Sequence, residues 1–155
     1  MKRLITCLTV FLFSYSFNAV HAQDASAVVS KYLSVKNALV TGNAATAAAQ
    51  AGELQKAIAA TDAKAFPAGL QATLSGGAKA IADSKDVSKQ RTAFGDLSVN
   101  MIQFVKTIKP GSGTLYVDYC PMKKLSWLSE EEEIKNPYYG NAMLSCGNVT
   151  ETIKP

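Results

Sequence analysis

Four sulfur-bearing side chains lie in two short segments near the C-terminal end of the chain. Cys120 and Met122 belong to the first segment, and Met143 and Cys146 belong to the second. Thiolate and thioether sulfurs are soft donors, which select Cu(I) and related ions over Mg, Ca or Mn. The four side chains therefore predict a soft-metal site if the fold brings the two segments to one place.

An N-terminal leader decides which other groups remain available. Lys2 and Arg3 precede an apolar run over 4–17, and small residues at 20 and 22 precede a cleavage position after Ala22. This pattern predicts a secretory signal peptide over residues 1–22 and an exported protein. The apolar run is shorter than the ~20 residues of a spanning helix, so we expect no membrane insertion after cleavage.

Removing the leader excludes several functions. It removes His21, the only histidine, so no Ser-His-Asp or Cys-His pair remains and the common zinc sets lose their imidazole. There is also no glycine loop of the Walker or dinucleotide type. We therefore expect no enzyme. Losing Lys2 and Arg3 lowers the formal net charge from +4 to about +2, too weak a bias to indicate nucleic acid.

The competing interpretation of the two cysteines is a structural disulfide between Cys120 and Cys146. Exported proteins with two cysteines usually pair them. Closing a loop of this length would stabilise a fold by about 3–4 kcal/mol on the chain-entropy model. If metal binds instead, Lys123 and Lys124 would favour the Cys120 thiolate, and Trp127 would shield the site.

The elements that must position these residues differ between the two parts of the chain. Residues 23–110 are rich in alanine and predict four helices, over 25–40, 44–60, 67–82 and from Asp86 to Ile108. Short connections between these helices predict an up-down four-helix bundle. Apolar positions three and four apart define its core, in which Met101 is a packing residue and not a ligand.

Some residues predict where the helices begin. Asn43 and Asp86 are good N-caps for the second and fourth helices, and Pro67 suits the first position of the third. Gly76 and Gly77 weaken the third helix or permit a close contact with a neighbouring helix.

Residues 111–155 form a tail with a different pattern. The alternation over 114–119 predicts a strand, and 142–149 could supply its partner. Between them, Ser129 and Glu132 form a capping box, which predicts a short helix that stops at Asn136 before Pro137. The glutamates that follow Ser129 are expected to face water.

The chain resembles a known family over essentially its whole mature length. The residues that carry the resemblance are 119–122, 127–129, 133–140, 143–144 and 146–147 in the tail, with 90–94 and 97–98 upstream. The family comprises exported bacterial domains of unknown function, found alone or fused to periplasmic adaptor subunits of copper/silver efflux systems. The resemblance implies a helical domain associated with heavy-metal handling, whose sulfur motif matches Cys120, Met122, Met143 and Cys146. Because no adaptor region is attached here, it implies a free-standing binder or chaperone.

The expectation is a mainly α periplasmic protein with one domain over 23–155, in which 23–110 form the bundle and 111–155 the Cys/Met-bearing, β-containing tail. It would bind Cu(I) or Ag(I) for buffering or delivery, with a heavy-metal efflux adaptor or another metal-delivery protein as partner. The alternative is a structural or interaction module with a Cys120–Cys146 disulfide and no metal, in which Tyr138 and Tyr139 contact a partner.

Overall fold

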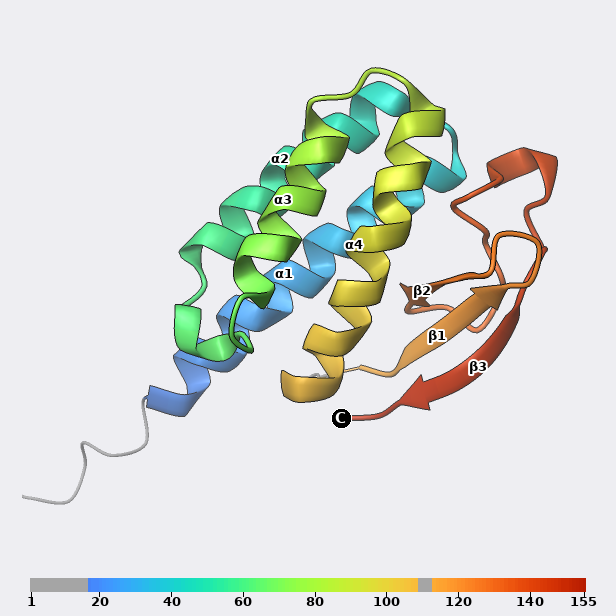
Figure 1. The fold of residues 1–155 in the computed structure, drawn as a ribbon. Helices are drawn as coiled ribbons and strands as arrows, with labels where there is room; N and C mark the ends of the chain where they lie inside the picture. Colours follow the sequence, from blue (N-terminus) through green and yellow to red (C-terminus); the bar gives the residue numbers. More distant parts are fainter. Residues whose placement is uncertain (1–16, 109–112) are drawn as a thin grey trace, which may run out of the picture.

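A computed structural model describes residues 17–108 and 113–155, with side chains from residue 25 onward. Within these ranges the chain is mainly helical, with four α-helices followed by a small antiparallel sheet (Figure 1). The helices are α1 (Phe17–Val40), α2 (Ala44–Ala60), α3 (Leu70–Ala82) and α4 (Val87–Ile108), with a short 3-10 helix η1 (Ala63–Ala65) between α2 and α3. The sheet contains β1 (Leu115–Cys120), β2 (Leu125–Ser129) and β3 (Asn148–Ile153), and η2 (Gly140–Ala142) is a second 3-10 helix.

Two predictions, the N-terminal leader and the boundary between the bundle and the tail, fall on residues that the structure does not describe in full. Residues 1–16 of the predicted leader, 1–22, are not described, and neither are the side chains of 17–22. The predicted boundary between bundle and tail, at 110/111, lies within the undescribed residues 109–112. Within the described ranges, no helix has both the length and the hydropathy that a bilayer-spanning segment needs.

Side-chain caps explain where two of the helices, α2 and α4, begin. Asn43 Oδ1 accepts a hydrogen bond from Thr46 N at 3.0 Å, and Asp86 Oδ1 accepts one from Ser88 N at 2.7 Å, which confirms both predicted N-caps. The prediction that Pro67 opens the third helix is wrong. Pro67 begins a turn in which Leu70 N donates to Pro67 O at 3.0 Å, and α3 begins only after Gly69, whose φ is 78°.

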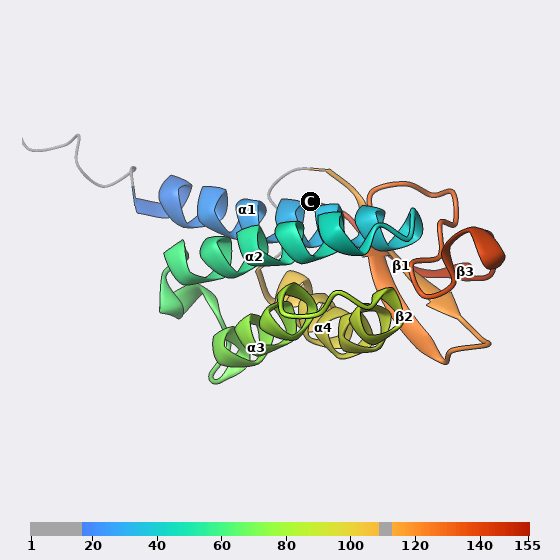
Figure 2. The same ribbon diagram turned by 90° about the horizontal axis from the view of Figure 1, so that it is seen from above.

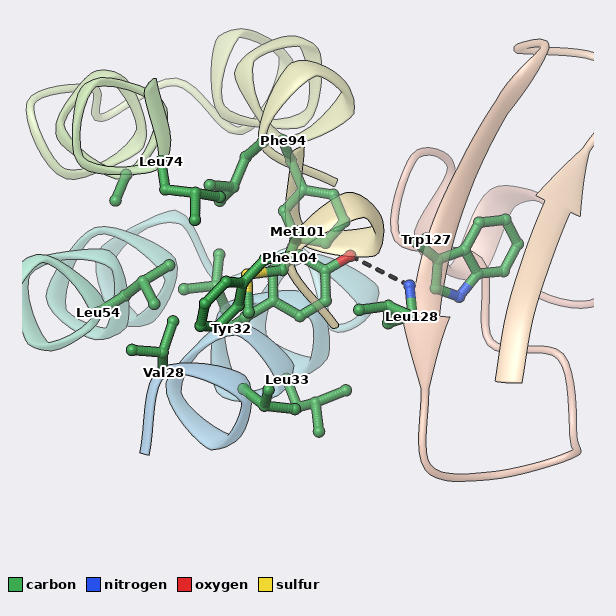
Figure 3. Packing of buried hydrophobic residues seen from close by; sticks show 14 of the residues in the cluster. Val28, Tyr32, Leu33, Leu54, Leu74, Phe94, Met101, Phe104, Trp127 and Leu128 are labelled. Atoms are coloured by element: carbon green, nitrogen blue, oxygen red, sulfur yellow. Dashed lines mark hydrogen bonds between the residues drawn. The ribbon is translucent and has the colours of Figure 1, made fainter. Parts of the chain in front are cut away.

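The predicted apolar faces form the core of the helical part. Their members are buried on all four helices: Val28, Tyr32, Val35, Leu39, Leu54, Ile58, Leu70, Leu74, Ala78, Ile81, Phe94, Leu97, Met101 and Phe104. Met101 is fully buried, which confirms that it is a packing residue (Figure 3). Burying one such large side chain contributes about 1.5–3 kcal/mol, so this core accounts for most of the driving force for folding.

Each helix packs against the next helix along the chain, and α1 also packs against α4. Seen from above, α1 and α2 lie beside each other, α3 and α4 lie beside each other, and the sheet lies at one end of the helices (Figure 2). The sheet reaches the helices mainly through β2, which packs against α4. The tail is therefore held on the helical part and does not hang free of it.

The sheet has the strand order β2-β1-β3, with both pairs antiparallel. The predicted strand over 114–119 is confirmed as β1, shifted by one residue. Its predicted partner over 142–149 is misplaced, because β3 begins only at Asn148, after a turn at Leu144 and Ser145. The central strand also has a second partner, β2, which the sequence reasoning did not predict.

The predicted capping box at Ser129 is wrong. Ser129 is the last residue of β2, and residues 130–133 form bends and not a helix. Strand pairing buries Trp127 and Leu128 completely, and this burial outweighs the local helix preference of the glutamates. The Ser129 hydroxyl instead accepts hydrogen bonds from Glu131 N at 3.1 Å and from the buried Lys36 Nζ at 3.4 Å.

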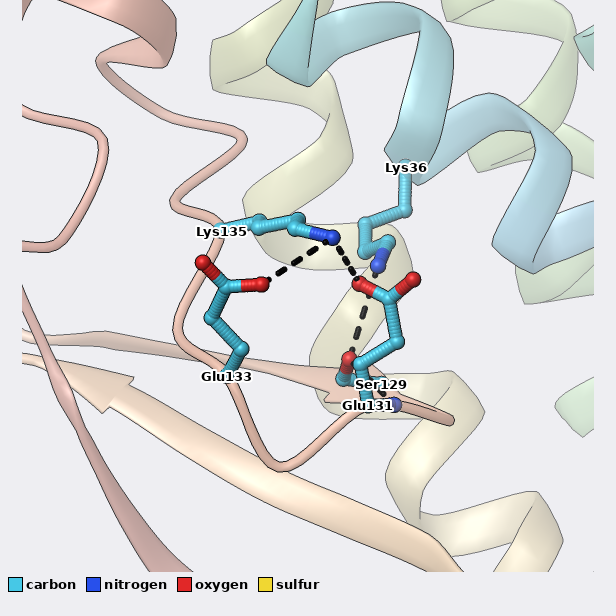
Figure 4. A network of polar contacts seen from close by, with 5 residues as sticks. All are labelled: Lys36, Ser129, Glu131, Glu133 and Lys135. Atoms are coloured by element: carbon cyan, nitrogen blue, oxygen red, sulfur yellow. Dashed lines mark hydrogen bonds and ion pairs between the residues drawn. The ribbon is translucent and has the colours of Figure 1, made fainter.

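The glutamates that follow Ser129 are exposed, as expected. Lys135 Nζ lies 2.6 Å from Glu131 Oε2 and 3.4 Å from Glu133 Oε2, beside the Lys36–Ser129 contact (Figure 4). Exposed ion pairs of this kind contribute at most about 1 kcal/mol, so they shape the loop more than they stabilise it.

Candidate dithiol site

The two cysteines of the tail lie in contact. Cys120 Sγ and Cys146 Sγ are 3.7 Å apart, and both are free thiols. The topology explains this contact, because Cys120 ends β1 and Cys146 lies two residues before β3, the neighbouring antiparallel strand. Cys120 is fully buried and Cys146 is half-buried, so the pair opens to solvent on the Cys146 side.

The surroundings favour the thiolate on Cys120. Burial alone would raise the pKa of this thiol, but hydrogen bonds from the backbone amide of Lys123, the side chain of Asn136 and the Cys146 thiol together lower it below its ordinary value. Burial and the neighbouring Cys120 raise the pKa of Cys146. The pair is therefore unequal, because the thiolate form is favoured more strongly on Cys120 than on Cys146.

Lys123 and Lys124 were predicted to favour the Cys120 thiolate, and the geometry gives Lys123 a different way of doing so. Lys123 favours the thiolate through its backbone amide, while its ammonium lies 5.3 Å from the centre of the Tyr139 ring. The turn after Cys120 makes the amide available, since Lys124 N donates to Cys120 O at 2.7 Å and Lys124 has a φ of 56°.

Both methionines lie on the two loops that bring the cysteines together. Met122 is in the turn between β1 and β2 and is 64% exposed, and Met143 follows η2 and is 39% exposed. Cys146 N donates to Met143 O at 3.1 Å, so Met143 and Cys146 belong to one turn. Neither methionine is a core packing residue. Together with Leu144 they are the exposed apolar side chains of these two loops, and we call these three residues the methionine rim.

Trp127 does not cover the pair from outside. It is fully buried in β2, opposite Asp118, and meets the Tyr138 ring edge-on at 5.7 Å between ring centres. A Cβ atom placed on Gly147 would lie 3.0 Å from Trp127 Cη2, so the indole lies beneath the residue that follows Cys146. Figure 3 shows Leu128 directed toward the helices and Trp127 directed away from them.

Asn136 is a residue of the site that the sequence reasoning assigned only as a helix stop. It is fully buried, and its Nδ2 donates to Cys146 O at 2.6 Å. Its side chain also stabilises the Cys120 thiolate. The sequence offered one signal for this role, the position of Asn136 between the two cysteine segments. A buried side-chain amide needs hydrogen-bond partners for both its oxygen and its nitrogen.

Within residues 17–108 and 113–155, no group of three or more His, Cys, Asp or Glu side chains could hold a metal ion. The sulfur contact that the fold does assemble among these residues is the one between Cys120 and Cys146.

The comparisons with known proteins give a match for the helical part. A family described as "Protein of unknown function (DUF3347)" matches residues 28–113, which is more than half of the chain. The chain belongs to this DUF3347 family. No curated protein and no solved structure matches it.

The DUF3347 match begins within α1, covers α2 and α3, and extends past the end of α4. It ends before β1, so the cysteine pair lies beyond the matched residues. Membership of a family of unknown function confirms that part of the expected resemblance. The DUF3347 description assigns no activity to the chain.

Proposed function

We propose that the protein binds a soft metal ion, Cu(I) or Ag(I), at the Cys120–Cys146 pair, and that it buffers or delivers this ion. The observation that carries the proposal is the 3.7 Å contact between two free thiols, one of which is favoured as a thiolate. A thiolate is the form of cysteine that binds metal, and soft ions prefer it over oxygen donors.

The spacing of the two sulfurs indicates the kind of coordination. With metal–sulfur bonds of ~2.3 Å, a separation of 3.7 Å corresponds to a sulfur–metal–sulfur angle of about 107°. An angle this far from linear leaves room for a third or fourth ligand. Met122 and Met143 are the proposed neutral ligands, because their exposed side chains are free of packing constraints and lie on the same two loops.

The proposal also includes a cellular compartment and a partner protein. We infer export to the periplasm after cleavage behind Ala22, and metal exchange with a heavy-metal efflux adaptor or another delivery protein. The resemblance to exported domains that are fused to such adaptors supports this, and so does the methionine rim, which a partner's metal site could approach. We also infer an up-down arrangement of the four helices, which their packing in chain order supports. Trp127 would shield the site from below.

The second candidate is a structural or interaction module in which the pair forms a disulfide. The same contact favours it, since the sulfurs would have to approach by only about 1.7 Å to reach bonding distance. Tyr138 is buried, and its hydroxyl donates a hydrogen bond to Ser126 O at 2.7 Å. Of the two adjacent tyrosines, Tyr139 is therefore the one that could contact a partner protein.

A thiol count and a competition titration separate the two candidates. Free thiols are counted in protein purified from the periplasm without reductant, and the reduced protein is titrated anaerobically with Cu(I) against a chelator of known affinity. Effective competition supports the metal site. An intact disulfide, together with no competition by the reduced protein, would end the metal proposal in favour of the module. An N-terminal residue other than Gln23 would contradict the proposed cleavage.

Three methionine variants then test the rim. Met122→Leu and Met143→Leu remove one thioether each and should weaken Cu(I) binding without changing the thermal midpoint. Met101→Leu is the matched control, because this methionine is fully buried in the helical core and the swap nearly conserves volume. If the rim variants bind Cu(I) as tightly as the control does, the thioethers are not ligands.

A further inference from the structure

Asn136 uses its whole side chain to connect the turn that carries it with the second cysteine. Its Oδ1 accepts hydrogen bonds from Tyr138 N at 2.8 Å and Tyr139 N at 3.3 Å. Its Nδ2 donates to Cys146 O at 2.6 Å. The carbonyl half of the amide thus fixes the local turn, and the NH2 half reaches the segment that ends in Cys146.

The same NH2 group also faces the first cysteine. The Asn136 side chain is near enough to the Cys120 sulfur to lower the pKa of this thiol and favour its ionised form. An amide nitrogen has two hydrogens, so it can serve Cys146 O and Cys120 Sγ at once. One fully buried side chain therefore binds the backbone of Cys146 and acts on the thiol of Cys120, at the two ends of the segment that contains it.

We propose that Asn136 is the positioning residue of the dithiol, and that its NH2 group sets the contact between Cys120 and Cys146. The assembly of the pair can be measured without metal, and its consequence for Cu(I) binding rests on the proposed function. The backbone bond from Asn136 N to Leu144 O, at 2.8 Å, keeps the segment near the loop when the side chain is changed. Loss of the NH2 group should therefore misplace Cys146 and leave the fold in place.

Asn136→Asp tests the two halves of the amide separately. Aspartate keeps an oxygen for Tyr138 N and removes the donor to Cys146 O and Cys120. The measurement is the equilibrium of the pair in glutathione buffers. In this reaction two protein thiols and one oxidised glutathione give one protein disulfide and two reduced glutathiones, and the equilibrium constant reports how closely the thiols are held. We expect the constant to fall about tenfold or more.

Two further variants separate positioning from charge and from general damage. Asn136→Ala removes the donor without adding a charge, and its equilibrium constant should fall as well. Asn100→Asp on α4 adds the same charge and loses a comparable but exposed bond, from Asn100 Nδ2 to Asp96 O at 2.7 Å. It should leave the constant unchanged. Circular dichroism confirms that each variant keeps its helices.

The outcomes are distinct for the two proposals. A wild-type constant in Asn136→Ala would overturn the positioning role, as would an equal fall in Asn100→Asp. If Asn136→Ala does not fold, an unchanged constant in Asn136→Asp overturns it. Failure of the wild-type protein to compete for Cu(I) would remove the metal proposal alone, because the glutathione measurement contains no metal.

Discussion

Tyr32 in α1 accepts a hydrogen bond from the backbone amide of Leu128 in β2, with 3.1 Å between Tyr32 Oη and Leu128 N (Figure 3). Its hydroxyl also lies 2.7 Å from Ser98 Oγ in α4. Since the phenol oxygen accepts from Leu128, its own hydrogen is available for Ser98. One fully buried side chain therefore connects two helices and the edge of the sheet.

Removing this hydroxyl should loosen the sheet from the helices. In Tyr32→Phe the Leu128 amide loses its partner in a buried place, which costs about 1–3 kcal/mol of unfolding free energy. Urea denaturation measures the loss. Tyr116→Phe is the control, because Tyr116 is half-buried in β1 and its hydroxyl makes no hydrogen bond within the described residues. Equal stability of the two variants would contradict a connecting role for Tyr32.

Asp118 should make the stability of the metal-free protein depend on pH. The residue is fully buried in β1, and neither carboxylate oxygen has a hydrogen-bond partner among the described residues. Burial raises the pKa of Asp118 to about 7, and the nearby Lys36 ammonium opposes this shift. In the unfolded chain an aspartate has a pKa of about 3.9.

The sign of the effect follows from these two pKa values. Below pH ~4 the carboxyl is protonated in both states. Between pH ~4 and ~7 only the folded protein keeps the proton, so unfolding releases it and stability falls as the pH rises, by about 2–4 kcal/mol in total. Asp118→Asn should flatten this slope and raise stability at pH 8. A wild-type stability that rises between pH 4 and 7, or an unchanged slope in the variant, would contradict this assignment.

The two adjacent glycines of α3 should respond in opposite ways to alanine. A Cβ at Gly76 would meet nothing within 4 Å, so Gly76→Ala should stabilise the helix by about 0.5–1 kcal/mol. A Cβ at Gly77 would lie 3.3 Å from Leu97 Cβ on α4. Gly77→Ala should therefore push the two helices apart and lower the thermal midpoint. Calorimetry compares the two, and a stabilising Gly77→Ala would show that the close contact is not needed.

Gly140 should be intolerant of any side chain. Its φ is 55°, and a Cβ there would lie 2.7 Å from Val40 O and press on the Arg91 guanidinium. Gly140→Ala should cost about 2–3 kcal/mol and move η2, which leads into the Met143–Cys146 turn.

The control for Gly140 is Gly69→Ala. Gly69 has a φ of 78° but open space around it, so its substitution measures backbone strain without a clash, about 1–2 kcal/mol. Urea denaturation gives both losses. The glutathione equilibrium should change only for Gly140→Ala, and an equal response of the two variants would show that η2 does not place Cys146.

The helical part could be predicted because its signals are local. Alanine content and apolar spacing determine the helices, and the caps at Asn43 and Asp86 act within their own turn. Met101 was assigned correctly for the same reason, since its neighbours on the stripe already placed it in the core.

The tail was predicted less well because its structure depends on pairing between distant residues. Leu125–Ser129 is a strand because β1 lies beside it, while the residues from Ser129 onward have a local preference for helix. The contact of Cys120 with Cys146 follows from the order β2-β1-β3, and strand order is not a property of either segment. Asn136 was missed because the two cysteines on which its side chain acts lie ten or more residues away in the sequence.

The position of β3 in the sheet offers a way to detect when the two sulfurs become bridged. β3 is an edge strand, most of its residues are exposed, and it begins two residues after Cys146. Any bond that joins the two sulfurs, through metal or directly, fastens the start of this strand to the end of β1. The C-terminal strand is thus a built-in reporter, because amide hydrogen exchange at Val149, which pairs with Asp118, slows when the sulfurs are bridged.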